Sequence, residues 1–221
     1  MLDAYPPHEQ EARAKGVPML GSGRIFPVDE KQIIIDPFPL PKYWPRAYGL
    51  DVGWNRTAAI WGAWDRENDT LYLTSEHYMG QQPPQVHADA IKSRGAWMAG
   101  AIDPAAAGAN QRDGKCLLDE YRELGLLLTE ADNSVEAGIM AIYRRLTSGR
   151  LKVFRSLPNW AREFRIYRRD EKGKVVKEND HAMDATRYLV MTGMQHATTE
   201  PIDDDDVDIG WDDGRSKVTG Y

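Results

Sequence analysis

Three aspartates stand at positions that a turn or a helix cap explains poorly when they are taken together. Asp51 ends the apolar run 47–51, and Asp103 ends the apolar run 99–103. Each would lie at the carboxyl end of a sheet strand, where α/β folds place their ligands. Asp184 lies within a predicted helix, beyond the first positions that a capping residue would occupy. Its neighbours are small and apolar, so its carboxylate needs a partner. Taken singly, Asp51 or Asp103 is more often a strand-end turn or a cap.

Three neighbouring carboxylates would form a cage of hard oxygen ligands, which suits Mg²⁺ or Mn²⁺. Two such ions could share the cage, one activating water and the other stabilising the leaving 3′ oxygen of a phosphodiester. His181 and Asp180 precede Asp184 by three and four residues and could face the same side, as a proton carrier and a further metal ligand. Alternatively, His181 only packs or hydrogen-bonds at the helix start, which Asn179 or Asp180 would cap.

The hydrophobic pattern places these residues on a mixed α/β sheet with helices on both faces. Three closely spaced strands come first and suggest an antiparallel meander, after which helices and strands alternate up to a C-terminal helix. A hairpin turn is expected at 169–176. The expected strands are 47–54, 57–65, 71–78, 99–104, 126–129 and 151–154, and the expected helices are 86–99, 114–124, 134–148, 159–169 and 180–194.

Length and composition favour one globular domain with a segment at each end. The chain has 221 residues, of which 42% are hydrophobic, enough for one sizeable core. Residues 1–46 are rich in proline and predict a linker or wrapping arm, 47–196 the domain, and 197–221 a disordered acidic tail. No apolar run could span a bilayer and no signal peptide is visible, so we expect a soluble intracellular protein without membrane contacts. Cys116 is the only cysteine, which excludes an intrachain disulfide and a thiolate zinc cluster.

Charge is unevenly distributed along the chain. The formal net charge is −6, but residues 201–221 hold seven Asp against one Arg and one Lys, a net of −5. Residues 144–177, here called the basic segment, contain twelve Arg or Lys against three acids, a net of +9. Such a concentration is a plausible electrostatic footprint for nucleic acid. A solvated face of charged helices is an equally good explanation.

Four stretches of the chain resemble the C-terminal nuclease domain of the large terminase subunit of tailed bacteriophages, which has a ribonuclease-H-like fold. They are GLDVGWNRTAAIWGAWD, AIDPAAAGANQRDGK, GRLKVF and GKVVKENDHAMDATRYLV. The resemblance covers residues 5 to about 194, and its upstream part is similar to the connection between that nuclease and a packaging ATPase. In that family, the positions that match Asp51, Asp103 and Asp184 bind the metals. Some members also use a histidine at the position of His181, whereas Asp180 is a weaker match.

The resemblance implies a metal-dependent endonuclease that cuts concatemeric double-stranded viral DNA, with little sequence preference and with two Mg²⁺ or Mn²⁺ ions. It also implies a portal protein and a small terminase subunit as partners, at the viral procapsid in the host cell cytoplasm. The chain lacks the GxxxxGK[ST] motif of the ATPase half, so we expect an isolated domain or a truncated product that cannot translocate DNA by itself. Little sequence preference fits contacts with phosphates rather than bases. We expect these contacts from basic residues that flank the hairpin turn: Arg168, Arg169, Lys172 and Lys174.

Two other functions stay open at this point. Another ribonuclease-H-like enzyme, such as a Holliday-junction resolvase or an RNA–DNA hybrid nuclease, would use the same kind of acids, although the long N-terminal segment argues against it. A non-catalytic module could instead dock on a portal protein or a small subunit through its acidic tail and basic face. The intact Asp51, Asp103 and Asp184 argue against this second alternative.

Overall fold

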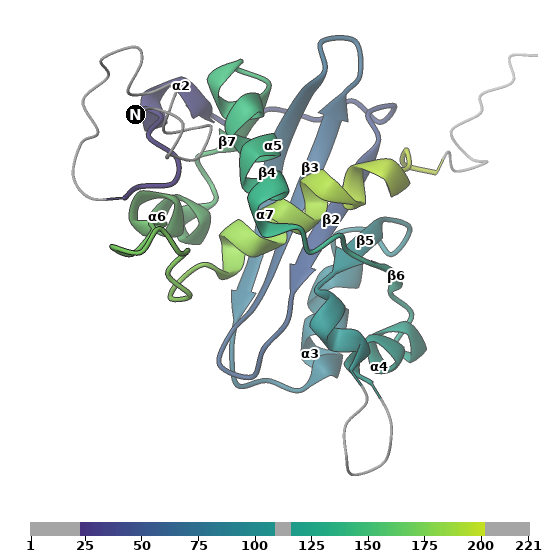
Figure 1. The fold of residues 1–221 in the computed structure, drawn as a ribbon. Helices are drawn as coiled ribbons and strands as arrows, with labels where there is room; N and C mark the ends of the chain where they lie inside the picture. Colours follow the sequence, from purple (N-terminus) through teal and green to yellow (C-terminus); the bar gives the residue numbers. More distant parts are fainter. Residues whose placement is uncertain (1–22, 109–115, 202–221) are drawn as a thin grey trace, which may run out of the picture.

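The computed structural model describes residues 23–108 and 116–201. Their centre is a seven-stranded mixed sheet in the spatial order β1-β7-β4-β3-β2-β5-β6 (Figure 1). The middle strands β2, β3 and β4 form the expected antiparallel meander, and β5, β6, β7 and β1 extend it on both sides in parallel pairings. The strands are β1 Ile34–Ile35, β2 Arg46–Asp51, β3 Thr57–Asp65, β4 Thr70–Met79, β5 Ala99–Ile102, β6 Leu127–Glu130 and β7 Leu151–Phe154.

Helices cover both faces of the sheet, as the sequence predicts. On one face α7 runs across β2 and β3, with α5 and α6 beside it (Figure 1). On the other face α3 and α4 cover the part of the sheet near β2 and β5. Among the described helices, none combines the length and the apolar character that a membrane span requires. The helices are α2 Glu30–Ile33, α3 Pro84–Lys92, α4 Leu117–Glu123, α5 Val135–Thr147, α6 Pro158–Ile166 and α7 His181–Met191, with short 3-10 turns η2 Pro104–Ala107 and η3 Gly193–His196.

The alternation of side chains along β2 explains why its sequence is an unbroken apolar run. Ala47 belongs to the hydrophobic cluster beneath α5, α6 and α7, whereas Tyr48 and Leu50 belong to the cluster beneath α3 and α4. Successive side chains of a strand point to opposite faces, and both faces of this strand are covered. Asp51, which ends the strand, is buried as well.

Three helices end three or more residues earlier than the sequence predicts, and one of them is α7, which ends at Met191 rather than at 194. The helix expected over 86–99 is α3, which ends at Lys92 because Gly95 adopts a φ of +130° that a helix cannot contain. The helix expected up to 169 is α6, which ends at Ile166 because the chain then turns into the hairpin. That hairpin is present as expected, with Gly173 at its tip at a φ of +78°.

The described part of the expected N-terminal arm packs on the domain. Ile25 and Phe26 are buried, and the N–H of Ile25 donates to Tyr167 O at 3.0 Å. Three consecutive isoleucines at 33–35 form the end of α2 and the edge strand β1, elements that the sequence analysis did not expect. The division of the chain at residues 46 and 196 stays a prediction. The acidic stretch from residue 202 onward lies outside the described residues.

Candidate active site

Two of the predicted acids meet at one edge of the sheet. Strands β2 and β5 are parallel neighbours with Leu50 opposite Ile102, so the residues that follow this pair, Asp51 and Asp103, leave the sheet side by side. The N–H of Asp103 donates to Leu50 O at 3.0 Å and fixes this arrangement. Asp103 also caps the turn η2, because its Oδ1 accepts from Ala105 N at 3.0 Å. Asp103 therefore both caps a 3-10 turn and belongs to the candidate site.

Helix α7 carries the third acid to the same edge because it lies very close to β2. A Cβ atom on Gly49 would lie 1.9 Å from Ala185 O, so the backbones approach to a distance that only glycine permits. Asp184 precedes Ala185 and is 7% exposed. The charges of Asp184 and Asp103 both add to the effect of burial, which raises the pKa of Asp51. We call Asp51, Asp103 and Asp184 the acid cluster.

Asp51 forms a hydrogen-bonded pair with the histidine that starts α7. His181 Nδ1 lies 2.9 Å from Asp51 Oδ2. Burial raises the pKa of Asp51 to about 6; the hydrogen bond with His181 opposes this shift, and the charges of Asp184 and Asp103 add to it. The same hydrogen bond raises the pKa of His181. The structure thus brings His181 into the acid cluster, through Asp51.

Two basic side chains that the sequence analysis did not assign to the site contact Asp184. Arg187 is 1% exposed, and its Nη2 lies 3.1 Å from Asp184 Oδ1 while its Nη1 donates to Asn133 Oδ1 at 3.0 Å. Lys177 Nζ lies 2.8 Å from Asp184 Oδ2 and 3.2 Å from Asp180 Oδ2. The spacing of three residues from Asp184 could have revealed Arg187. Lys177 lies in irregular chain before α7, where no periodicity identifies it.

Helix α7 begins after Asp180, as the sequence predicts, but a different side chain caps it. Asp180 holds the N-cap position but makes no cap hydrogen bond through its side chain, and Asn179 adopts a φ of +52° before it. Instead Glu163 of α6, which is fully buried, accepts from Ala182 N at 2.6 Å and from Tyr78 Oη at 2.5 Å. The prediction that Asp180 starts the helix is confirmed by its N-cap position, but its side chain does not cap the helix, because a carboxylate from a different helix satisfies a free N–H group.

The donor chemistry of the acid cluster fits a hard divalent cation, since all its members are carboxylates. Asp180 adds a buried Oδ2, which lies 3.2 Å from the ammonium group of Lys177 and is a further oxygen that a cation could use. Within the described residues, no group of three or more His, Cys, Asp and Glu side chains is already drawn together at metal-binding spacing. The contacts of Lys177 and Arg187 balance part of the negative charge there.

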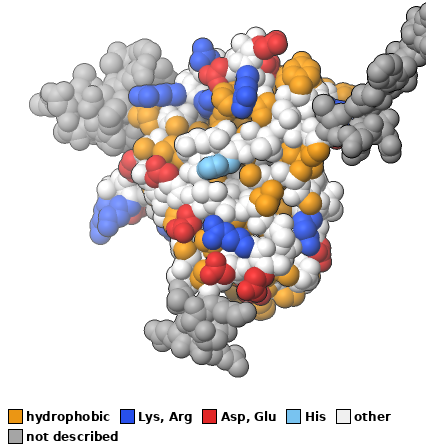
Figure 2. Space-filling view, turned by 90° about the vertical axis from the view of Figure 1, so that its right-hand side faces the viewer, with side chains coloured by type: hydrophobic (Ala, Val, Ile, Leu, Met, Phe, Trp, Pro, Cys, Tyr) orange, Lys and Arg blue, Asp and Glu red, His pale blue; other side chains and the backbone are white. Residues whose placement is uncertain are grey.

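Several members of the basic segment are paired with carboxylates from other parts of the fold. Arg145 and Arg150, for example, both lie 3.1 Å from Asp69. Arg169, a predicted DNA contact, is 8% exposed and holds both oxygens of Glu136, at 2.8 and 2.6 Å. This contact gives Arg169 a role in fixing the hairpin rather than in meeting DNA. On the face shown in Figure 2, basic and acidic side chains are likewise interspersed.

The other three predicted DNA contacts are exposed on the hairpin between α6 and α7. Asp170 Oδ1 accepts from the backbone N–H groups of Lys172 and Lys174, both at 2.9 Å, and holds the turn closed. Lys177 follows within three residues and reaches the acid cluster. The hairpin therefore presents Arg168, Lys172 and Lys174 on chain that leads directly into the site.

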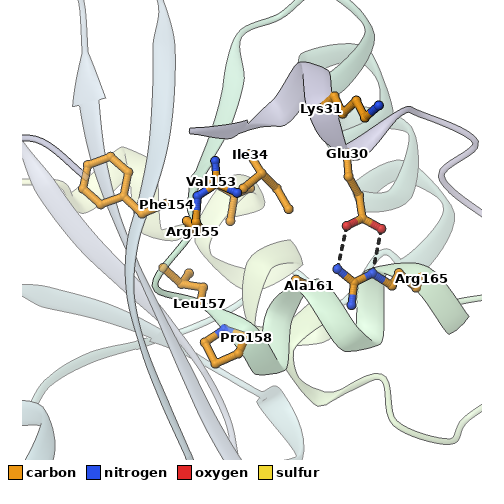
Figure 3. Close-up of a pocket in the computed structure, with 10 residues that line it drawn as sticks. All are labelled: Glu30, Lys31, Ile34, Val153, Phe154, Arg155, Leu157, Pro158, Ala161 and Arg165. Carbon is orange, nitrogen blue, oxygen red and sulfur yellow. Dashed lines mark hydrogen bonds and ion pairs between the residues drawn. The ribbon is translucent and has the colours of Figure 1, made fainter. Parts of the chain in front are cut away.

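A cavity of about 480 Å³ lies elsewhere, between α2, β7 and α6 (Figure 3). Three of the four charged side chains that line it pair within the fold: Arg165 donates to both oxygens of Glu30, at 2.8 and 2.7 Å, and Arg155 contacts Asp36 at 2.7 Å. No member of the acid cluster lines it. The cavity therefore adds nothing to the candidate site.

Sequence comparison relates this chain to phage packaging proteins. The family model described as Terminase RNaseH-like domain matches residues 48–192. The chain is 36% identical over 206 residues to the large terminase subunits of Salmonella phage P22 and Enterobacteria phage LP7. These alignments cover 86% of this chain but 40% and 42% of those proteins. The chain thus spans about two fifths of the length of the curated relatives it matches.

Structural comparison agrees with the sequence. The nuclease domain of the P22 large terminase superposes with a TM-score of 0.75 at 32% identity, covering 81% of this chain and 96% of that domain. The likeness confirms the expected ribonuclease-H-like fold, and the matched residues 48–192 contain the acid cluster. The chain therefore belongs to the terminase RNaseH-like domain family.

Proposed function

We propose that this chain is the metal-dependent endonuclease of a phage DNA-packaging terminase, which hydrolyses phosphodiester bonds of concatemeric double-stranded DNA. The observation that carries the proposal is the meeting of Asp51, Asp103 and Asp184, from three separate elements, at the carboxyl ends of β2 and β5. The 32% identity to the P22 nuclease domain supports it.

The acid cluster would hold two Mg²⁺ or Mn²⁺ ions, with Asp180 as a further ligand. When bound, such ions activate water and stabilise the leaving 3′ oxygen. Arg187 fixes the orientation of Asp184 through Oδ1. His181 holds Asp51 through Nδ1, which leaves its Nε2 as the ring nitrogen for proton transfer.

The exposed hairpin would bind the DNA backbone. Arg168, Lys172 and Lys174 are exposed on the same turn of chain, which continues through Lys177 to Asp184, so they would contact phosphates of DNA bound at the acid cluster. Contacts of this kind carry no base information, which agrees with cleavage of little sequence preference.

The partners and the place of action also belong to this proposal. The chain's relatives are large terminase subunits. By this likeness, it would work beside an ATPase domain, a portal protein and a small terminase subunit, at the procapsid in the host cytoplasm.

Cleavage of supercoiled plasmid tests the enzymatic part of the proposal. We expect the purified chain to nick and linearise the plasmid in Mn²⁺ or Mg²⁺ and not in EDTA. Asp51→Asn, Asp103→Asn and Asp184→Asn should each abolish cutting, whereas Asp119→Asn, which alters an exposed acid of α4, should not. Cutting in EDTA, or equal cutting by the cluster variants, contradicts the proposal. Binding to a portal protein without any nicking would support the docking alternative.

The salt dependence of DNA binding tests the hairpin. We expect the triple variant Arg168→Ala/Lys172→Ala/Lys174→Ala to bind duplex DNA more weakly in EDTA. Its slope of log K against log salt should fall by about 1 for each phosphate that the variant no longer neutralises. Arg150→Ala removes an exposed arginine that is paired with Asp69 and is the matched control. An unchanged slope for the triple variant contradicts the proposed role of the hairpin.

A further inference from the structure

We propose that Lys177 is a tethered cation of the acid cluster, which must withdraw before the cluster takes up its full set of divalent ions. This inference rests on the proposed metal site and adds to it a residue that controls metal entry. Its starting point is a contact: Lys177 Nζ lies within 3.2 Å of carboxylate oxygens from both Asp184 and Asp180.

The ammonium group of Lys177 lies between the carboxylates of Asp180 and Asp184, where a cation shared by the two would lie. Asp180 and Asp184 are four residues apart at the start of α7, so their side chains share one side of the helix. Lys177 Nζ touches Oδ2 of both. These two side chains are almost fully shielded from water, 8% and 9% exposed, so they need a positive partner when they are ionised.

Lys177 and Arg187 both contact Asp184, but only Lys177 is exposed enough to move away from it. Arg187 is 1% exposed, is also held by Asn133, and contacts the opposite oxygen, Oδ1. The side chain of Lys177 is 57% exposed and extends from irregular chain between the hairpin and α7. Arg187 is therefore a fixed support of Asp184, whereas Lys177 can swing into solvent without disturbing the core.

Metal entry would consequently break two ion pairs. The ammonium group would have to leave Asp184 Oδ2 or Asp180 Oδ2 before that oxygen could bind a divalent ion. The free energy needed to break these contacts lowers the apparent affinity for the metal, and removal of the ammonium group restores it. Lys177 thus keeps the carboxylates neutralised while the site is without metal and raises the ion concentration at which the site fills.

Mn²⁺ binding to the metal-stripped protein, measured by calorimetry, tests this inference without relying on cleavage. We expect Lys177→Met to lower the dissociation constant for Mn²⁺ about threefold to tenfold, the factor for one or two partly exposed ion pairs. Lys177→Arg keeps the charge and should resemble the wild type. Lys174→Met removes the same charge three residues away, from an exposed position on the hairpin, and controls for the general loss of positive charge.

Thermal unfolding gives a second readout. Lys177→Met should melt below the wild type in EDTA, because two shielded carboxylates lose a partner, and the deficit should disappear in saturating Mn²⁺. A dissociation constant for Lys177→Met that equals or exceeds that of the wild type overturns the inference, as does an equal gain in Lys174→Met.

The variant Asp51→Asn distinguishes an error in the role of Lys177 from an error in the proposed metal site. If the wild type binds no Mn²⁺, or if Asp51→Asn binds it equally well, the metal site is wrong and the role of Lys177 falls with it. If binding depends on Asp51 but Lys177→Met matches the wild type, the metal site stands and the role of Lys177 alone is refuted.

Discussion

The aliphatic stem of Arg187 passes directly over Gly138, so that a Cβ atom on Gly138 would lie 2.4 Å from Arg187 Cγ and 2.6 Å from its Cδ. Gly138 lies inside α5, where glycine disfavours the helix by about 1 kcal/mol relative to alanine. Its presence there gives the buried guanidinium group a path from α7 to Asp184 and Asn133.

We therefore expect Gly138→Ala to lower the free energy of unfolding by about 1–3 kcal/mol, the usual effect of overpacking, despite the better helix propensity of alanine. Urea denaturation of the metal-free protein measures this. The double variant Gly138→Ala/Arg187→Ala should lose less than the sum of the two single variants, because truncation of Arg187 removes the clash. Additive losses would show that the two residues do not interact.

Removal of the charge that caps α7 should destabilise the fold. In Glu163→Gln one of the two oxygens becomes an amide nitrogen, so either Ala182 N or Tyr78 Oη loses its acceptor in a fully buried place. We expect a loss of about 1–3 kcal/mol in the free energy of unfolding. Glu178→Gln alters an exposed acid just before α7 and should change stability by less than about 0.5 kcal/mol. Equal stability of both variants would contradict the capping role.

Asp51 should make the metal-free protein less stable above pH 6. Burial and the neighbouring acids raise its pKa from 3.8 in the unfolded chain to about 6 in the fold. As pH rises through this window, the unfolded chain releases its proton while the folded chain keeps it, so the free energy of unfolding falls. We expect Asp51→Asn to be more stable than the wild type by about 1–2 kcal/mol at pH 7.5 in EDTA. The advantage should vanish near pH 4, and an advantage independent of pH would contradict this explanation.

The buried pair His77 and His87 should make the protein sensitive to mild acid. His77 Nε2 lies 2.8 Å from His87 Nδ1, between β4 and α3. Burial lowers the pKa of both rings, that of His77 to about 4. Below pH 6.5 His77 binds a proton in the unfolded chain but stays neutral in the folded chain. The free energy of unfolding therefore decreases as the pH falls from 6.5 towards 4. Between pH 7.5 and pH 5, His77→Gln should lose about 1–2 kcal/mol less than the wild type in denaturant titrations.

Trp54 should contribute to DNA binding rather than to stability. It follows Asp51 by three residues in the loop between β2 and β3 and is 70% exposed. An exposed aromatic ring in the loop that follows Asp51 is suited to pack against a sugar or an unstacked base. In an Asp51→Asn background without metal, Trp54→Ala should weaken binding to duplex DNA in fluorescence anisotropy, with stability within about 0.5 kcal/mol. Tyr43→Ala, similarly exposed before the other end of β2, is the control.

The acids of the site could be predicted because each is anomalous in its own surroundings. Asp51 and Asp103 interrupt apolar strands at their ends, and Asp184 lies in a helix surface that is otherwise buried. The periodicity of the apolar residues and the acidic character of these three side chains identify them without knowledge of the fold. The meander and the alternating helices follow from the same local signals.

Other parts of the site depend on contacts between distant segments. Nothing near Glu163 in the sequence shows that its carboxylate ends at the first turn of α7. Lys177 looks like one more charge in the basic segment until the fold places it on Asp184. Arg169 is the converse case, since it was predicted to bind DNA from its neighbours in sequence, and Glu136 of α5 takes up its charge.

The hydrogen bond between His181 and Asp51 joins residues that are 130 positions apart in the chain. A ribosome therefore completes both strand acids well before it reaches the helix that carries Asp184 and His181. Until that helix has been synthesised and has docked at Gly49, the growing polypeptide holds only part of the acid cluster. A product that ended before α7 would contain the residues of all seven strands but lack Asp184 and His181, so formation of the acid cluster depends on synthesis of the last long helix.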